Sequence, residues 1–284
     1  MTNLAILGPG LLGGSIALAT RARGGHRVAI WARRAEMVAE VEALKVADCA
    51  STDVRAVVAD ADLVVLCVPV GAMPELARQV AGAIPAHAIV TDVGSVKASV
   101  CAELGAIFRG RGRFVGSHPM AGSEQTGIGA ARADLFEGAV SIVTPDENSD
   151  AEAVSKITGL WSALGSRVRQ LAPAEHDRVV ALVSHLPHVL AAALVNTVTA
   201  EDSAAFDFCG PGFRDTTRVA GGPPEMWNEI LRTNRVAVRA AAEALIEKLR
   251  ELTTLIDRDR PMTEFLTQAK TQRDRLRLPN QPNV

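Results

Sequence analysis

The chain has 284 residues, a formal net charge of −2 and four cysteines. Because a typical single domain has roughly 100 to 200 residues, we expect two domains. The balanced charge, with no basic stripe, argues against a nucleic-acid partner and favours a small-molecule substrate. The cysteines are far apart and form no CxxC pair, so we expect neither a zinc site nor a disulfide framework, as in a reducing cytoplasm.

The sequence also argues against a membrane protein. We identify no run that approaches the roughly 20 apolar residues of a membrane helix. The apolar segment from Leu4 to Ala19 lacks a basic leader and is interrupted by glycines, which is not typical of a signal peptide. We therefore expect a cytoplasmic protein.

A dinucleotide-binding pattern begins with the first strand. The apolar residues Leu4 to Leu7 precede the sequence GPGLLGG of residues 8–14, and a helix follows from Ser15. In such a pattern the first glycine allows the tight turn, the second lets the backbone approach a pyrophosphate, and the third allows close packing of helix on strand. The alternative is a glycine-rich turn without a ligand. We assign to the cofactor site Gly8, Gly10, Leu11, Leu12 and Gly13.

The residues after the second expected strand, Arg27 to Trp31, bear on the choice of cofactor. An acidic residue at this place would hold the adenosine ribose, but the chain has Ala32, followed by Arg33 and Arg34. Guanidinium groups pair with a 2′-phosphate and a carboxylate repels it, so NADP is favoured and NAD is the alternative. The arginines could also be solvated residues at the start of the next helix.

Strand and helix signals alternate up to about residue 171. Further strands are expected over 62–69, 88–93, 139–144 and 167–170, with a helix over 151–164, and we expect all of these strands to extend one sheet. Val68 and Pro69, at the end of one strand, are added to the cofactor site. We predict a Rossmann-type dinucleotide-binding domain over residues 1–171.

Long helical periods replace the strands after Pro173. We predict an all-helical domain over residues 172–284 that binds substrate and forms a homodimer. One helix face carries apolar residues in steps of three and four: Val238, Ala241, Leu245, Leu249, Leu252 and Ile256. Such a face is either the core of its own domain or a subunit contact, and here both uses are expected.

His118 is the strongest catalytic candidate. It follows the strand-like run of residues 114–116, and ligands of an open α/β sheet gather beyond the carboxyl ends of the strands. With an unperturbed pKa of roughly 6.5, an imidazole can accept a hydroxyl proton near neutral pH as hydride leaves the same carbon. The alternative is that His118 caps a turn ahead of Pro119.

Ser95 also follows an expected strand. It could hydrogen-bond the reacting hydroxyl or His118 at the cofactor site, or it could cap a helix that starts near Val96. Lys97, two residues later, could touch phosphate or pair with Asp92.

Two clusters in the helical half suggest a substrate site. Arg214 and Arg218 would share one helix face and could bind carboxylates, unless Asp215 pairs with one of them. A helix expected over 174–200 contains Pro187, which should bend it and direct Ser184 and His188 into a site. A metal site at this pair of histidines lacks a third ligand, so we expect no metal.

Five segments, taken together, resemble the prephenate and arogenate dehydrogenases of tyrosine biosynthesis. They are residues 8–15 (GPGLLGGS), 92–97 (DVGSVK), 116–122 (GSHPMAG), 184–188 (SHLPH) and 212–218 (GFRDTTR). The resemblance implies an oxidative decarboxylation with hydride transfer to NAD(P). It also implies that His118 accepts the proton of the ring hydroxyl, that Ser95 orients both, and that Arg218 holds a substrate carboxylate. Ser184 and His188 would line the side-chain pocket.

The choice of substrate depends on whether its side chain carries a keto acid or an amine. Residues 185–188 contain no carboxylate to bind an amine, and residues 224–228 resemble the branch of the family that uses prephenate. We therefore favour prephenate, with arogenate or both substrates as alternatives. A β-hydroxyacid dehydrogenase would need a lysine, and none occurs between Glu175 and Asn234. A non-catalytic NADP-binding redox sensor would leave His118 and the paired arginines unexplained.

Overall fold

The computed structural model describes residues 2–109, 113–123 and 125–276. It divides into two compact units. The first runs to Val180 and includes Gly221–Thr233, and the second comprises Ala181–Ala220 and the described residues from Asn234 onward. The division is not a single cut, because helix α10 (Pro224–Thr233) packs with the first unit although it comes from the C-terminal half.

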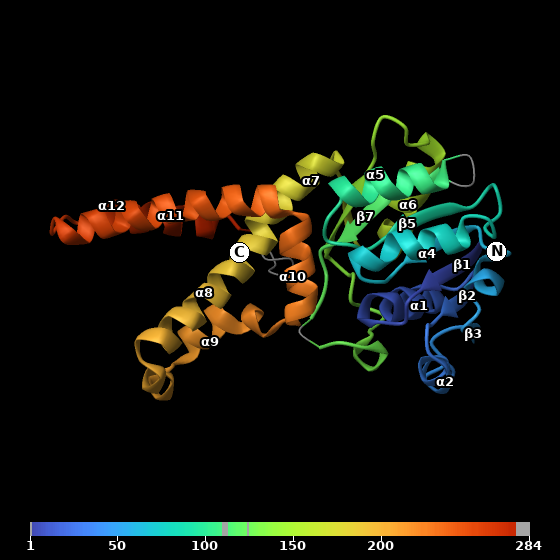
Figure 1. Cartoon of the computed structure of the whole chain (residues 1–284), viewed down its shortest axis with the longest axis horizontal. Helices are drawn as coiled ribbons and strands as arrows, with labels where there is room; N and C mark the ends of the chain where they lie inside the picture. The colour runs from blue at the N-terminus through green and yellow to red at the C-terminus, as the bar shows by residue number, and fades with distance from the viewer. Residues whose placement is uncertain (1, 110–112, 124, 277–284) are drawn as a thin grey trace. The chain divides into compact units, whose positions relative to one another are not determined.

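The first unit is built on a six-stranded parallel sheet in the order β3-β2-β1-β4-β5-β6. Figure 1 labels β1, β2, β3 and β5 of this sheet. The strands are β1 (Thr2–Leu7), β2 (His26–Trp31), β3 (Cys49–Ser51), β4 (Leu63–Leu66), β5 (Ile89–Asp92) and β6 (Arg113–Phe114). The strand order reverses between β1 and β4. In doubly wound sheets this is the point where ligands bind, beyond the carboxyl ends of the strands.

Helices cover both faces of this sheet, because alternate strand residues point to opposite sides. Leu4 and Ile6 of β1 belong to one core cluster, together with α1 (Leu11–Arg23), α2 (Ala35–Ala43) and α6 (Ala151–Ala163). Ala5 and Leu7 belong to the other, together with α3 (Val54–Val58), α4 (Met73–Val80) and α5 (Ala98–Phe108). This arrangement confirms the Rossmann-type fold.

Three later strands form a separate sheet, in the order β7-β8-β9. They are β7 (Gly116–Pro119), β8 (Val140–Thr144) and β9 (Arg167–Gln170), with β7 antiparallel to β8. The prediction that 139–144 and 167–170 extend the first sheet was therefore wrong. The last strand of the first sheet, β6, ends at Phe114, and β7 of the second sheet begins at Gly116. The run Phe114–Val115–Gly116, which looks like one strand in the sequence, therefore crosses from one sheet to the other.

The second unit is helical. It contains a π-helical turn (Ala181–His185), α8 (Leu186–Glu201), α9 (Pro211–Thr217), α11 (Arg235–Asp257) and α12 (Thr263–Asp274), with 3₁₀ turns at Ser203–Phe208 and Arg218–Gly221. The expected helix over 174–200 is thus α7 (Pro173–Val180), the π turn and α8. Pro187 explains the π turn, because it has no N–H to donate to Val183 and its ring crowds that carbonyl.

The run Pro173–Glu201 is also long and apolar enough to span a membrane. The expectation that no run approaches this length was wrong, since residues 179–200 carry no charged side chain. Length and composition alone are weak evidence for a membrane span, because a core helix of a water-soluble protein meets the same criteria. The run contains the buried residues His176 and Asp177, which have polar partners in the first unit.

Candidate active site

The glycine turn between β1 and α1 has the geometry that the sequence pattern predicted. Gly8 has φ of 121°, a left-handed conformation that favours glycine, and a Cβ atom there would lie 2.4 Å from the carbonyl oxygen of Cys67. A Cβ atom on Gly13 would lie 2.0 Å from the carbonyl oxygen of Gly8. Gly10 is the N-cap of α1, and a Cβ atom on it would have no neighbour within 4 Å. A phosphate group can therefore reach the N–H groups that begin this helix.

Leu11 and Leu12 begin α1 and pack partly against the core. Val68 and Pro69 follow the neighbouring strand β4, where Val68 is half-buried and Pro69 exposed. Near them, the Glu229 carboxylate of α10 accepts a hydrogen bond from the N–H of Gly71, a contact that the sequence did not predict. The structure thus gathers the predicted cofactor residues of β1, α1 and β4 at the switch point of the sheet.

At the end of β2, Ala32 is buried and donates its N–H to the carbonyl oxygen of Ser51, 3.1 Å away. Arg33 and Arg34 are exposed, and Arg34 is the N-cap residue of α2. The chain thus has two exposed arginines directly after β2.

His118 does not follow a strand but lies within one. It is the third residue of β7, opposite Ile142 of β8, and is only 8% exposed. The prediction of a histidine just past the end of a main-sheet strand was wrong in this detail, because β7 pairs in the second sheet. The turn-capping alternative is excluded for the same reason.

The imidazole of His118 has a partner that the sequence did not predict. Its Nδ1 atom lies 2.9 Å from Nε2 of His176 on α7, and the two rings meet edge to face. Nδ1 of His176 in turn lies 2.8 Å from Oδ1 of Asp177. Burial lowers the pKa of His176 below its ordinary value, and the neighbouring Asp177 carboxylate only partly opposes this.

Asp177 also caps α5. Its carboxylate accepts hydrogen bonds from the N–H of Lys97, at 2.7 Å, and from that of Ala98, at 2.9 Å. Burial by itself would raise the pKa of Asp177, but the hydrogen bonds from His176 and these two N–H groups outweigh it and lower the pKa. Because the N-cap residue of α5 is Lys97, and Asp177 accepts from the N–H groups of Lys97 and Ala98, the capping role considered for Ser95 was wrong.

Ser95 is half-buried in the loop between β5 and α5. A fully buried ion pair between Lys97 and Asp92 supports this loop. Asp92 also accepts from the N–H of Gly94, at 2.8 Å, and from that of Ser117, at 3.2 Å. Of the two roles considered for Lys97, pairing with Asp92 is confirmed. This carboxylate links the Ser95 loop to the strand that carries His118.

The remaining predicted residues lie in the helical unit. Ser184 is half-buried in the π turn, and His188 is buried on α8. Burial lowers the pKa of His188, partly opposed by a hydrogen bond to the Val219 backbone. Arg214 is exposed on α9, and the exposed Arg218 begins the 3₁₀ turn that follows. The contact with Val219 brings His188 next to the segment that carries Arg218.

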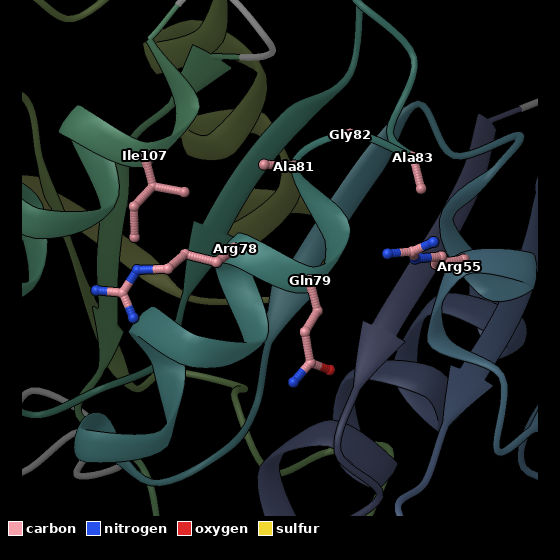
Figure 2. Close-up of a pocket in the computed structure, with 7 residues that line it drawn as sticks. All are labelled: Arg55, Arg78, Gln79, Ala81, Gly82, Ala83 and Ile107. Atoms are coloured by element: carbon pink, nitrogen blue, oxygen red, sulfur yellow. The ribbon is translucent and has the colours of Figure 1, made fainter.

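A groove of about 480 Å³ lies elsewhere on the first unit (Figure 2). Residues of α3, α4, the following turn and α5 line it: Arg55, Arg78, Gln79, Ala81, Gly82, Ala83 and Ile107. None of the predicted site residues is among them, and Glu103 binds Arg78 at 2.9 Å. Within the described part of the chain, no three His, Cys, Asp or Glu side chains gather to hold a metal ion.

The switch-point glycine turn and the buried histidine pair, with a helical unit attached, define the class of two-domain nucleotide-binding oxidoreductases. Comparison with known families agrees. Residues 16–170 match the nucleotide-binding domain of prephenate dehydrogenase, and residues 172–270 match its dimerization domain. The chain belongs to the prephenate dehydrogenase family of NAD(P)-dependent oxidoreductases, as the resemblance of its motifs implied.

Individual relatives cover nearly the whole chain. The cyclohexadienyl dehydrogenase of Zymomonas mobilis is 36% identical over 259 residues, which are 89% of this chain and 88% of the relative. The structure of Aquifex aeolicus prephenate dehydrogenase with hydroxyphenyl propionate and NAD⁺ is 33% identical, with a TM-score of 0.90 over 96% of this chain and 97% of that one. Synechocystis arogenate dehydrogenase is 30% identical, with a TM-score of 0.84 over 96% and 99%.

Proposed function

We propose that this chain is a prephenate dehydrogenase, which converts prephenate to 4-hydroxyphenylpyruvate and carbon dioxide with hydride transfer to NAD(P) in tyrosine biosynthesis. The observation that carries the proposal is the buried His118, whose Nδ1 is hydrogen-bonded to a second buried histidine. A buried, oriented imidazole suits a general base, because its geometry is fixed before the substrate binds.

In this reaction His118 accepts the proton of the ring 4-hydroxyl. The nicotinamide, when bound, supplies the acceptor for the hydride that leaves C4. The bond between C1 and its carboxylate then breaks, carbon dioxide leaves, and the bonding electron pair makes the ring aromatic. The C4 oxygen, now a phenolate, takes the proton back from His118 to give the hydroxyl of the product. Ser95 orients the hydroxyl and His118. The protein contributes position and charge rather than a covalent intermediate.

The residues at the sheet's switch point fit a dinucleotide. Gly8, Gly10 and Gly13 form the turn, and the N–H groups at the start of α1, which has no side-chain cap, hold the pyrophosphate. Leu11, Leu12, Val68 and Pro69 surround it. We propose NADP as the favoured cofactor because Arg33 and Arg34 are exposed and Ala32 replaces an acidic residue. NAD is the alternative, and it is the cofactor named for the Aquifex aeolicus structure.

For the substrate, we propose that Arg218 binds a carboxylate and that Arg214 provides further positive charge. Ser184 and His188 line the pocket for the side chain. Because burial keeps His188 neutral near pH 7, it suits a polar, uncharged contact. The absence of a carboxylate among residues 185–188 favours prephenate over arogenate.

A dual-substrate cyclohexadienyl dehydrogenase is the second candidate. It is favoured by the 36% identity to the Zymomonas mobilis enzyme of that name. For either activity we propose a cytoplasmic homodimer, with residues 1–171 as cofactor domain and 172–284 as substrate and dimerisation domain. The match to a dimerization domain supports the dimer.

The test is to add prephenate or arogenate with NADP⁺ or NAD⁺ and to follow the absorbance of the reduced nicotinamide. We expect the highest kcat/KM with prephenate and NADP⁺. Comparable values for both substrates would establish the dual-substrate enzyme. 3-Hydroxyisobutyrate serves as a control that should give no signal. No increase with any combination of the two family substrates and two cofactors would refute the proposed function.

A further inference from the structure

We infer that His176 and Asp177 act as positioning residues that hold His118 in the tautomer protonated on Nδ1, so that its Nε2 receives the substrate proton. The inference deepens the proposed function and rests on it for the identity of the reaction. Its basis is the continuous row of hydrogen bonds from His118 through His176 to Asp177.

The direction of these hydrogen bonds follows from the last member of the row. The low pKa of Asp177 keeps it ionised, and an ionised carboxylate only accepts hydrogen bonds. It accepts two from the backbone of Lys97 and Ala98, and its Oδ1 is 2.8 Å from Nδ1 of His176. His176 must therefore carry a proton on Nδ1.

The second step concerns the charge of His176. It is completely buried, and burial, together with the nearby Lys97 ammonium, favours its neutral form. The carboxylates of Asp177 and Asp92 oppose this, but the net effect lowers the pKa of His176. A neutral imidazole with its proton on Nδ1 has an acceptor at Nε2. His118 must then donate from Nδ1, which leaves its own lone pair on Nε2.

This arrangement also assists the reaction. When His118 takes a proton it becomes an imidazolium, and its Nδ1–H bond to His176 becomes charge-assisted and stronger. His176 therefore makes His118 a better base without touching substrate. In the Ser-His-Asp triad, a carboxylate hydrogen-bonded to the catalytic imidazole has this role. Here the imidazole of His176 lies between the imidazole of His118 and the carboxylate of Asp177.

Asp177 also connects the base with Ser95. The two N–H groups that it binds belong to Lys97, the N-cap residue of α5, and to Ala98, its first residue, which come two and three residues after Ser95. One carboxylate thus fixes both the ring that orients His118 and the loop that carries the second catalytic candidate.

The first test is a nitrogen-15 NMR spectrum of the whole enzyme with labelled histidines, without substrate. His118→Gln identifies the His118 signals, and His176→Gln identifies those of its partner. Near pH 7.5 we expect a protonated Nδ1 and an unprotonated Nε2 for both rings. The opposite tautomer of His118 would overturn the inference. Because no substrate is used, the result does not depend on the proposed reaction.

The second test compares two variants of His176 in the prephenate assay. His176→Phe removes the acceptor and keeps the ring, so kcat should fall roughly 10- to 100-fold while KM stays within about twofold. The acidic limb of the kcat profile should move to lower pH. His176→Gln restores an amide acceptor and should recover most of the activity.

The exposed His87 provides the matched control, since His87→Gln should leave activity unchanged. A folded His176→Phe enzyme with full kcat and an unshifted pH profile would overturn the inference. So would an equal loss in the Gln and Phe variants. If the Phe variant does not fold, the tautomer measured by NMR decides.

Discussion

Nδ1 of His118 lies 2.9 Å from Nε2 of His176, although 58 residues separate them in the sequence. The contact joins β7 to α7, and Asp177 on the same helix caps α5. The candidate base is therefore held by two hydrogen-bonded elements of the first unit rather than by a flexible loop. Such preorganisation is what proton transfer in an active site requires.

Replacing the base itself is the most direct test of its role. His118→Asn should lower kcat by roughly 10²- to 10⁴-fold, because it removes an interaction made mainly as the proton moves. The KM for prephenate should change by less than about twofold. Steady-state assays with prephenate and NADP⁺ measure both, and exposed His26→Asn is the control. An unchanged kcat would exclude His118 as the base.

The buried histidines should also make the fold sensitive to acid. The pKa of His176 in the folded chain lies below its ordinary value of 6.5. At a pH between these two pKa values, the unfolded chain therefore binds more protons than the folded chain. The free energy of unfolding should keep its full value above about pH 6.5. As the pH falls below about 6.5, it should decrease by up to about 1.4 kcal/mol per pH unit for each proton that unfolding takes up. His188 acts in the same direction. The low pKa of Asp177 adds a further loss of stability only below about pH 3.8, the ordinary pKa of an aspartate.

Urea unfolding between pH 5 and pH 8 measures this dependence. His176→Gln should reduce the slope below pH 6.5, and His87→Gln, at an exposed site, should not. An identical slope in the wild type and in His176→Gln would show that His176 is not held neutral by the fold.

Much of the fold was predictable because its signals are local. Runs such as Leu63–Leu66 are continuous and apolar, as in strands covered on both faces, and the glycine turn is defined by neighbouring residues. The second sheet was not predictable in this way. Val115 continues an apolar run across the change from β6 to β7, and the sequence pattern shows strand character but not the partner strand.

The site was predictable only in part, for a similar reason. Ser95 and His118 lie in motifs with recognisable spacing. Asp177 caps a helix whose first residues are about 80 positions away, whereas cap signals are read within a few residues. The adjacent pair His176 and Asp177, in the charged first turns of a helical run that is apolar from Val179 onward, was the signal that could have revealed this contact. Pro187 predicted a bend but not the π turn.

Arg218 should matter for binding rather than for chemistry. Arg218→Ala should raise the KM for prephenate roughly 10- to 100-fold, since a hydrogen bond to a charged group contributes about 1.5–3 kcal/mol. Arg218→Lys should recover part of the loss, because lysine keeps the charge without the forked geometry. Arg239→Ala, at an exposed arginine paired with Glu243, is the control. An unchanged KM would assign the carboxylate to Arg214 instead.

The preference for NADP can be tested at the end of β2. Ala32→Asp should favour NAD, but Ala32 is fully buried, so this change risks burying a carboxylate. The exposed Arg33 and Arg34 offer a cleaner test. The double change Arg33→Ala and Arg34→Ala should lower kcat/KM for NADP⁺ about tenfold or more and leave that for NAD⁺ within about twofold. Arg27→Ala, exposed at the other end of β2, is the control. Equal effects on both cofactors would show that neither arginine reads the 2′-phosphate.

The apolar face of α11 should hold two copies of the chain together. Val238 and Ala241, near its start, are buried within the chain, but Leu249 is 48% exposed and Ile256 is 55% exposed. Burying such a side chain contributes about 1.5–3 kcal/mol, and a twofold interface counts each substitution twice. The double change Leu249→Glu and Ile256→Glu should therefore convert a dimer to monomers in size-exclusion chromatography with light scattering. Leu44→Glu, at a site on the first unit that is 49% exposed, should leave the dimer intact. A double variant that remains dimeric at micromolar concentration would place the subunit contact elsewhere. A monomeric wild type would show that the chain forms no dimer.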